Sequence, residues 1–267
     1  MNRTMITRLP LLAMLAATIG LAGCDSDDDI PAAAPPAPVV ETFKVQVLHA
    51  SPDAPAVNVL VDRATALSDV DYKIGSGILS LPAGDHTIQV DGITPGGPAT
   101  VIGPATINFA ADTLYSIVAV GDVAAIEPVI LDQPDVPVAA ASARLRVLHA
   151  APMAPQVDVF ATTPGADLTA SAPIGTFAFK EDLGPIDVPA GDYQIRVTLP
   201  GDPSTVVYDS GTVTLNVGND WLVSAVENTT TGSSPISLVV LNGAGSLEVP
   251  DVNTTADIRV VHASADA

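Results

Sequence analysis

The chain has 267 residues, of which 48% are hydrophobic and only 4% aromatic. Its 30 acidic residues against 10 basic ones give a formal net charge of −20, which repels phosphate groups and argues against any nucleic-acid partner. The 24 prolines and 20 glycines predict short β-strands separated by turns.

Residues 1–23 have the pattern of a lipoprotein signal peptide. Arg3 and Arg8 supply the positive start, and the apolar stretch 9–21 is too short for a transmembrane helix of about 20 residues. The ending Leu-Ala-Gly-Cys resembles the bacterial lipobox, in which the cysteine is acylated and becomes the mature N-terminus. The sequence therefore predicts lipidation at Cys24, the only cysteine, and a membrane partner reached through acyl chains. An ordinary secretory signal with an incidental cysteine is the alternative.

Residues 24–42 predict a tether. An acidic run at 25–29 precedes a Pro- and Ala-rich stretch that favours extended polyproline II and forms a semi-rigid spacer. Asp25 resembles an inner-membrane retention signal, whereas the acidic run resembles tethers of surface-displayed lipoproteins. We expect an extracytoplasmic location in a bacterial cell envelope, either periplasmic or surface-exposed.

One stretch occurs twice and begins a third time, which fixes the organisation of the chain. Three blocks match between the two full copies: 45–55 with 145–155, 81–90 with 188–197, and 107–116 with 215–224. The separation between matching blocks grows after the first one, so an insertion around 162–182 predicts a longer loop in the second copy.

Each copy predicts an antiparallel, Ig-like β-sandwich of about seven short strands, so the fold class is all-β with tandem domains at 43–135 and 142–248. In the first copy, 43–50 alternates as a half-buried strand, and the nearly all-apolar 114–120 predicts a central strand. Pro-Ala-Gly-Asp at 82–85, and again at 189–192, predicts a tight turn. Its glycines, Gly84 and Gly191, are free to adopt positive φ. Further strands are expected at 56–61, 126–131, 222–226 and 236–241.

The ends of the second domain leave an alternative open. The junction at 132–142 offers little flexible length. Residues 257–267 repeat the first strand of a domain, and we favour the start of a third repeat over a terminal edge strand of the second domain. In the latter case, the first strand of the second copy would likewise pair with the first domain.

The matching blocks carry a resemblance to a known family. His49-Ala50-Ser51-Pro52-Asp53-Ala54-Pro55 and the Leu-Pro-Ala-Gly segment resemble a widespread bacterial family, domain of unknown function 4397, with tandem copies behind a lipobox. The second copy keeps the histidine and prolines but has Ala151 and Met153 for Ser51 and Asp53. The resemblance implies an extracytoplasmic β-sandwich and no particular activity.

The repeated histidine invites a functional interpretation. His49 with Asp53, or with Asp62 across the sheet, could form a metal site or an acid–base pair, although a metal site needs three or four ligands. We favour a structural role, in which the half-buried ring donates to a carbonyl of the following proline-rich turn. The same structural role is expected for the other signature residues of both copies: Pro52, Pro55, Gly84, His149, Pro152, Pro155 and Gly191.

Other candidate sites have weaker patterns. Asp69, Asp71 and Asp85, or Asp182, Asp187 and Asp192, could hold calcium at loop ends, but they lack the spacing of a calcium loop. Four aromatic residues could form a sugar-stacking platform, although burial is expected for the first two: Trp221, Tyr115, Tyr193 and Tyr72.

No catalytic, cofactor or metal site is predicted, and no enzyme signature occurs in the sequence. We expect a non-enzymatic, lipid-anchored envelope protein with spacer or interaction modules, used in adhesion or in contact with an envelope protein or polysaccharide. The alternative is a module that binds a polysaccharide, a small molecule or a divalent metal at its loop ends.

Overall fold

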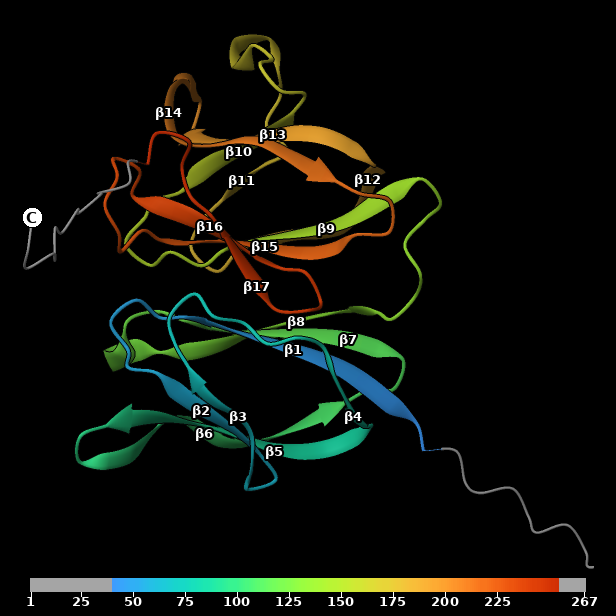
Figure 1. Ribbon diagram of the computed structural model, residues 1–267, viewed down its shortest axis with the longest axis vertical. Helices are drawn as coiled ribbons and strands as arrows, with labels where there is room; N and C mark the ends of the chain where they lie inside the picture. Colours follow the sequence, from blue (N-terminus) through green and yellow to red (C-terminus); the bar gives the residue numbers. More distant parts are fainter. Residues whose placement is uncertain (1–39, 255–267) are drawn as a thin grey trace, which may run out of the picture. The chain divides into compact units, whose positions relative to one another are not determined.

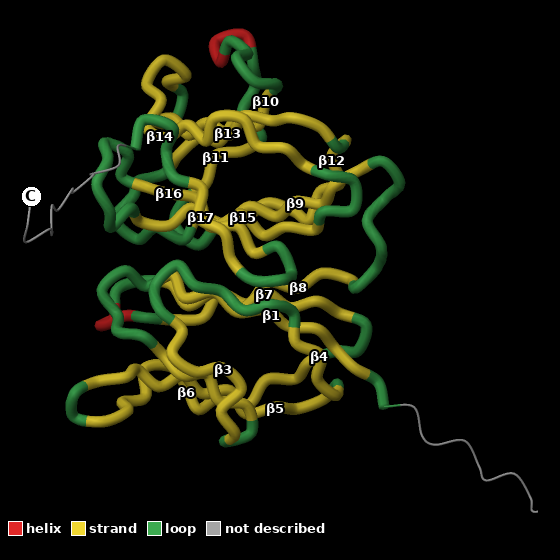
Figure 2. Tube along the Cα trace, in the orientation of Figure 1, coloured by secondary structure: helices red, strands yellow, loops and turns green. Residues whose placement is uncertain are grey.

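The computed structural model describes residues 40–254, which belong to one compact unit and contain seventeen strands and two short 3-10 helices (Figures 1 and 2). The predicted signal peptide, Cys24, most of the tether and the terminal fragment 257–267 lie outside these residues. None of the helices in the described part is long and apolar enough to cross a membrane.

The first repeat consists of two four-stranded sheets packed as a sandwich. One sheet has the order β4 (Leu79–Pro82), β1 (Thr42–Ala50), β7 (Thr113–Val120) and β8 (Glu127–Pro134). The other has the order β3 (Ala64–Val70), β2 (Val57–Val61), β5 (Gly84–Thr94) and β6 (Gly97–Phe109). Helix η1 (Val123–Ala125) connects β7 to β8.

The second repeat has the same plan with one added strand. One sheet has the order β12 (Asp182–Pro189), β9 (Ser142–His149), β15 (Asp220–Glu227), β16 (Ile236–Leu241) and β17 (Ser246–Val249). The other has the order β11 (Gly175–Phe177), β10 (Val157–Thr162), β13 (Gly191–Leu199) and β14 (Asp202–Leu215). The predicted insertion is confirmed: the connection from β10 to β11 is long and contains η2 (Leu168–Ala170).

The all-β fold with two tandem sandwiches is confirmed, and so is the central place of β7 between β1 and β8. Two details were wrong. The repeats have eight and nine strands rather than about seven, and the pairs β1–β7 and β9–β15 are parallel. The chain leaves β1 for the opposite sheet and returns in the same direction at β7, which is the long crossover that a parallel pair requires.

The Pro-Ala-Gly-Asp segments are corners and not hairpin turns. Strand β4 ends at Pro82 in one sheet, and β5 starts at Gly84 in the other; β12 and β13 are joined in the same way. Gly84 and Gly191 have φ of +128° and +155°, values that side-chain-bearing residues rarely adopt. The glycines therefore let the chain change sheets within one residue.

Strand β1 is covered on both faces, so the prediction of a half-buried first strand was wrong. Phe43 and Val45 point into the first sandwich, as predicted. Leu48 and Ala50, on the opposite face, are fully buried against residues of the second repeat. The expectation that β9 could pair with the first domain was also wrong, because β9 lies between β12 and β15.

Candidate functional site

The signature histidines close the turns that follow them. His49 is 1% exposed, and its Nε2 lies 3.1 Å from the carbonyl oxygen of Pro55. The backbone N–H of Ser51 donates to Nδ1 at 3.3 Å, so the ring is neutral and donates through Nε2. Burial lowers the pKa of His49 below its usual value and keeps it neutral. His149 repeats this contact, with Nε2 3.1 Å from the oxygen of Pro155.

The carboxylates considered as partners of His49 are engaged elsewhere. Asp53 accepts a hydrogen bond from the backbone N–H of Val123 at 2.7 Å. Asp62 pairs with His86 at 2.7 Å and accepts from the N–H of Thr87 at 2.9 Å. At the position of Asp53, the second repeat has Met153, whose side chain is exposed. A metal site or acid–base pair of His49 with Asp53 or Asp62 is therefore not formed.

The candidate calcium clusters do not form either. Within residues 40–254, no three His, Cys, Asp or Glu side chains are arranged to hold a metal ion. Asp182 pairs with Arg146 at 2.8 Å, Asp187 with Arg144 at 2.9 Å, and Asp192 accepts from Thr214 at 2.7 Å. These carboxylates stabilise strand pairs of the second repeat and its junction with the first.

The aromatic residues do not form a common platform. Tyr115 packs edge-on against Phe109, with ring centroids 4.9 Å apart, and Trp221 packs on the core of the second repeat. Tyr72 donates to the carbonyl oxygen of Glu227 at 2.8 Å, and Tyr193 donates to that of Pro189 at 2.8 Å. Tyr115 and Trp221, which were expected to be buried, are only partly buried. The four aromatic residues therefore do not share a surface on which a sugar could stack.

The corner carbonyls are held by different side chains in the two repeats. His86 Nε2 lies 2.8 Å from the oxygen of Pro82, whereas in the second repeat Tyr193 takes this role at Pro189. The bonds to Pro82 and then to Asp62 raise the pKa of His86. The bond from Thr87 and then the one from His86 lower the pKa of Asp62. The first repeat thus has a charged pair where the second has a neutral hydroxyl.

The surface between the repeats is the largest feature that the sequence analysis missed. Eleven buried residues from both repeats form one apolar cluster: Leu48, Ala50, Val118, Val120, Leu131, Leu148, Ala150, Leu222, Val226, Val239 and Leu241. Leu48 and Ala50 have their counterparts Leu148 and Ala150 in the same cluster, so both repeats offer the same face. Reciprocal use of one face is typical of an isologous interface.

The rim of this interface has a lysine of each repeat paired with an acid of the other. The lysines occupy equivalent positions, whereas Glu248 lies on the added strand β17 and Glu127 on β8. Lys73 of the first repeat pairs with Glu248 of the second at 2.6 Å, and Lys180 of the second pairs with Glu127 of the first at 2.7 Å. Both lysines have positive φ, of 67° and 73°, and both donate their backbone N–H to the backbone carbonyl oxygen of a signature histidine, His49 or His149. The signature histidine therefore supports the loop that contacts the other repeat.

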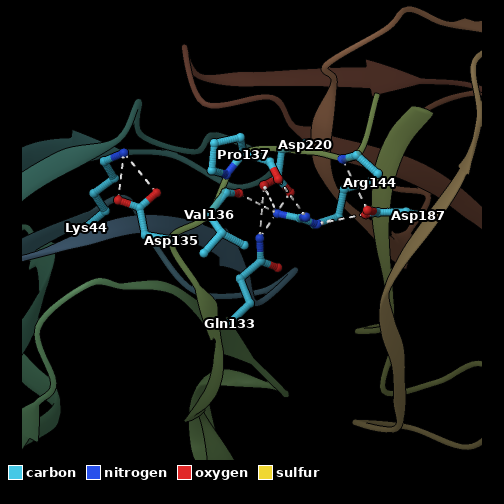
Figure 3. A network of polar contacts seen from close by, with 9 residues as sticks. Lys44, Gln133, Asp135, Val136, Pro137, Arg144, Asp187 and Asp220 are labelled. Carbon is cyan, nitrogen blue, oxygen red and sulfur yellow. Dashed lines mark hydrogen bonds and ion pairs between the residues drawn. The ribbon is translucent and has the colours of Figure 1, made fainter. Parts of the chain in front are cut away.

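The junction is fixed by a buried arginine. Arg144 is 7% exposed and donates to the carbonyl oxygens of Val136 and Pro137, at 2.9 and 3.3 Å, and to Asp187 at 2.9 Å (Figure 3). Its NH1 also lies 3.5 Å from Asp220, which accepts from Gln133 of the first repeat at 3.1 Å. The bond from Arg144 lowers the pKa of Asp187. These contacts tie the linker and both repeats together.

A mixed polar cleft of about 410 Å³ lies beside the interface. It is lined by Asp71, Tyr72 and Lys73 of the first repeat and by Thr229, Thr230 and Glu248 of the second, among others. The cleft thus combines hydroxyls, one ion pair and an aromatic edge.

Comparison with known proteins agrees with the repeat pattern. A family model described as "Domain of unknown function (DUF4397)" matches residues 43–160 and 161–267. The boundary between the two matches lies within β10, whereas the sandwiches meet at the linker between β8 and β9. A search of curated proteins finds no match.

Proposed function

Because the chain belongs to the DUF4397 family and joins its two repeats face to face, we propose that it is a non-enzymatic spacer and interaction module of the bacterial cell envelope. The observation that carries this proposal is the buried interface between the repeats, with the Arg144 contacts at the junction. A linked pair of sandwiches holds its outer surfaces in fixed positions, which suits a protein that presents a surface to an envelope protein or a polysaccharide in adhesion.

The engagement of the histidines supports a non-enzymatic role. In the described part of the chain, the ring nitrogens of His49 and His86 have protein partners, and Nε2 of His149 lies against Pro155. A general base needs a ring nitrogen within reach of a substrate proton. These rings instead close turns and corners of the fold.

We propose that acyl chains on Cys24 hold the module at the membrane, outside the cytoplasm, with residues 24–42 as the tether. The support is the lipobox-like end of the signal sequence and the extended composition of the tether. Cys24→Ser should move the protein from the membrane fraction to the soluble fraction, and globomycin should leave the unprocessed form. Asp25→Asn, which keeps the cysteine, is the control. An unchanged membrane fraction of Cys24→Ser would refute the anchor.

A ligand-binding module is the second candidate function, and the cleft beside the interface favours it. Clefts between domains with a few convergent polar groups are common ligand sites. A soluble polysaccharide or a divalent cation that occupies the cleft would stabilise the folded form by mass action. Thermal unfolding of the unit Val40–Ala267 with EDTA, with calcium and with envelope polysaccharide distinguishes the candidates. A ligand-dependent rise in melting temperature that is lost in Thr230→Val would favour the ligand-binding function over the spacer function.

A further inference from the structure

The interior of the second repeat is incompletely filled. Between the sheets of β9 and β10 lies an apolar cavity of about 100 Å³, adjoined by a smaller one of about 30 Å³. The two cavities share lining residues, among them Leu145, Val147, Ala161, Ile195 and Val223. Protein interiors rarely contain voids much larger than a water molecule, so a space of this size needs a cause.

The two repeats differ in the size of two core side chains, one of which lines the larger cavity. In the first repeat, Phe43 and Phe109 stack with ring centroids 4.4 Å apart and fill the end of the sandwich. Strand register places Ala143 at the position of Phe43, because Phe43 pairs with Leu81 and Ala143 with Val188. Leu215 takes the position of Phe109, because Phe109 pairs with Gly84 and Leu215 with Gly191. The strand register thus corrects the matched sequence blocks, which place Val217 there.

The backbone plan is thus kept while two aromatic rings are lost. The first repeat has a cavity of about 70 Å³ with its rings in place. In the second repeat, Trp221 and Tyr193 line the larger cavity but do not close it. Of the two exchanged positions, Leu215 lines the larger cavity and Ala143 does not, so the smaller side chain at 215 is the exchange that borders this space.

The chemistry of the lining selects the occupant. Water in a cavity needs two to four polar partners. The hydroxyl of Tyr193, which lines the space, already donates to Pro189, and the other lining side chains are almost all aliphatic. An apolar cavity of about 150 Å³ stays dry and binds benzene or xenon, and the space here approaches that size.

The space is bordered by side chains that also reach the surface. Ile186, Val188, Tyr193 and Trp221 line the larger cavity and are partly exposed. They lie near the corner at Gly191, where the chain passes between the two sheets. These four side chains are the ones that would have to move to admit a small molecule there.

We propose that the interior of the second repeat is a binding site for a small uncharged hydrocarbon, of the size of benzene or a short aliphatic chain. The site lies within one sandwich, and its larger cavity is lined by no residue of the interface cluster or of the cleft. It therefore depends neither on the membrane anchor nor on the spacer role, and its test is independent of theirs.

Methyl NMR of the unit Val40–Ala267 under xenon, and then with benzene, tests this site. Saturable shifts are expected at the methyl groups of Ile195 and Val223, and benzene should raise the melting temperature because it binds only the folded form. The double variant Ala143→Phe/Leu215→Phe, which restores the rings of the first repeat, should lose both effects.

Two further variants keep the test decisive. Leu215→Phe alone should weaken the shifts if the double variant fails to fold. Thr212→Phe, which adds the same ring on the exposed side of β14, should leave them unchanged. Shifts that rise linearly without saturation, or that persist in a folded Leu215→Phe variant at full size, would overturn the proposal.

Discussion

At the scale of single residues, two histidines with similar partners have pKa values shifted in opposite directions. His49 is buried and neutral, and burial lowers its pKa. His86 faces two acceptors, the oxygen of Pro82 and the carboxylate of Asp62, so both of its nitrogens donate and its pKa is raised. The charged form of His86 is therefore part of the folded state, whereas the charged form of His49 is excluded from it.

The pKa of His86 gives a pH dependence with a definite sign. Below the unfolded value of about 6.5, the contribution of His86 to stability is fully present, and it is lost as the pH rises through the higher folded value. His86→Tyr copies the second repeat, keeps a donor for Pro82 and removes this titration. Melting temperatures of the wild type and of His86→Tyr, measured between pH 5 and 9, should therefore differ most at low pH, where the wild type should have the higher value.

One result would contradict a charged His86 in the folded state. A difference between wild type and His86→Tyr that does not change with pH would show that His86 is not charged in the folded state. Asp62→Asn is the companion variant. It removes the carboxylate that faces the ring and should reduce the same pH-dependent difference.

Prolines follow a rule at the scale of strands. Within the described strands they occur only at sheet edges, in β4, β6, β8, β12 and β14, and none lies in a central strand. Proline lacks a backbone N–H and interrupts an exposed ladder, which blocks pairing with another chain. Of the remaining edge strands, β11 and β17 are only three and four residues long, and β3 has an irregular register.

The edge strand β8 offers a test of this protection. Pro128→Thr and Pro134→Thr together restore two donors on the outer side of the sheet. We expect faster concentration-dependent self-association in light scattering, with a melting temperature close to that of the wild type. Pro137→Thr, in the linker, is the matched control and should associate at the rate of the wild type. Equal association rates for all three proteins would contradict the role of the edge prolines.

The sequence predicted the elements better than it predicted their surroundings. Repetition and alternation located β1, β7 and the long loop after β10, because turn residues and apolar spacing are local signals. The partner of an exposed-looking face is not local. Along β1, Gln46 and Leu48 alternate with residues that face the core of the first sandwich. This alternation is the same whether water or another sheet covers the face that carries Gln46 and Leu48. For the same reason, Arg144 gave no signal: its partners Val136, Asp187 and Asp220 meet only after both repeats have folded.

The two repeats act as one body at the scale of the whole molecule. The residues of the shared cluster include many that are fully buried, whereas numerous side chains that face the sandwich interiors remain partly exposed. The most completely buried apolar surface of the protein thus lies between its repeats. Such an interface couples the unfolding of one repeat to that of the other.

Leu48→Ala and Leu148→Ala test this coupling. Each substitution leaves a cavity in the interface and should lower the free energy of unfolding by about 2–5 kcal/mol. Calorimetry of the wild type should give one transition, and the double variant should give two because the repeats then unfold separately. Val217→Ala, at an exposed position, should change stability by no more than about 0.5 kcal/mol. A single unshifted transition in the double variant would exclude the coupling.

The reciprocal interface sets a parity rule for chains built from this repeat. Each repeat has one apolar face of this kind, and here the two faces cover each other, so the pair is closed and offers no such face to a third repeat. Growth by duplication is therefore expected to proceed in pairs. In a chain with an odd number of repeats, one repeat would have its apolar face uncovered. That face would be expected to pack against the same face of a neighbouring chain, so the contact between repeats would become a contact between chains.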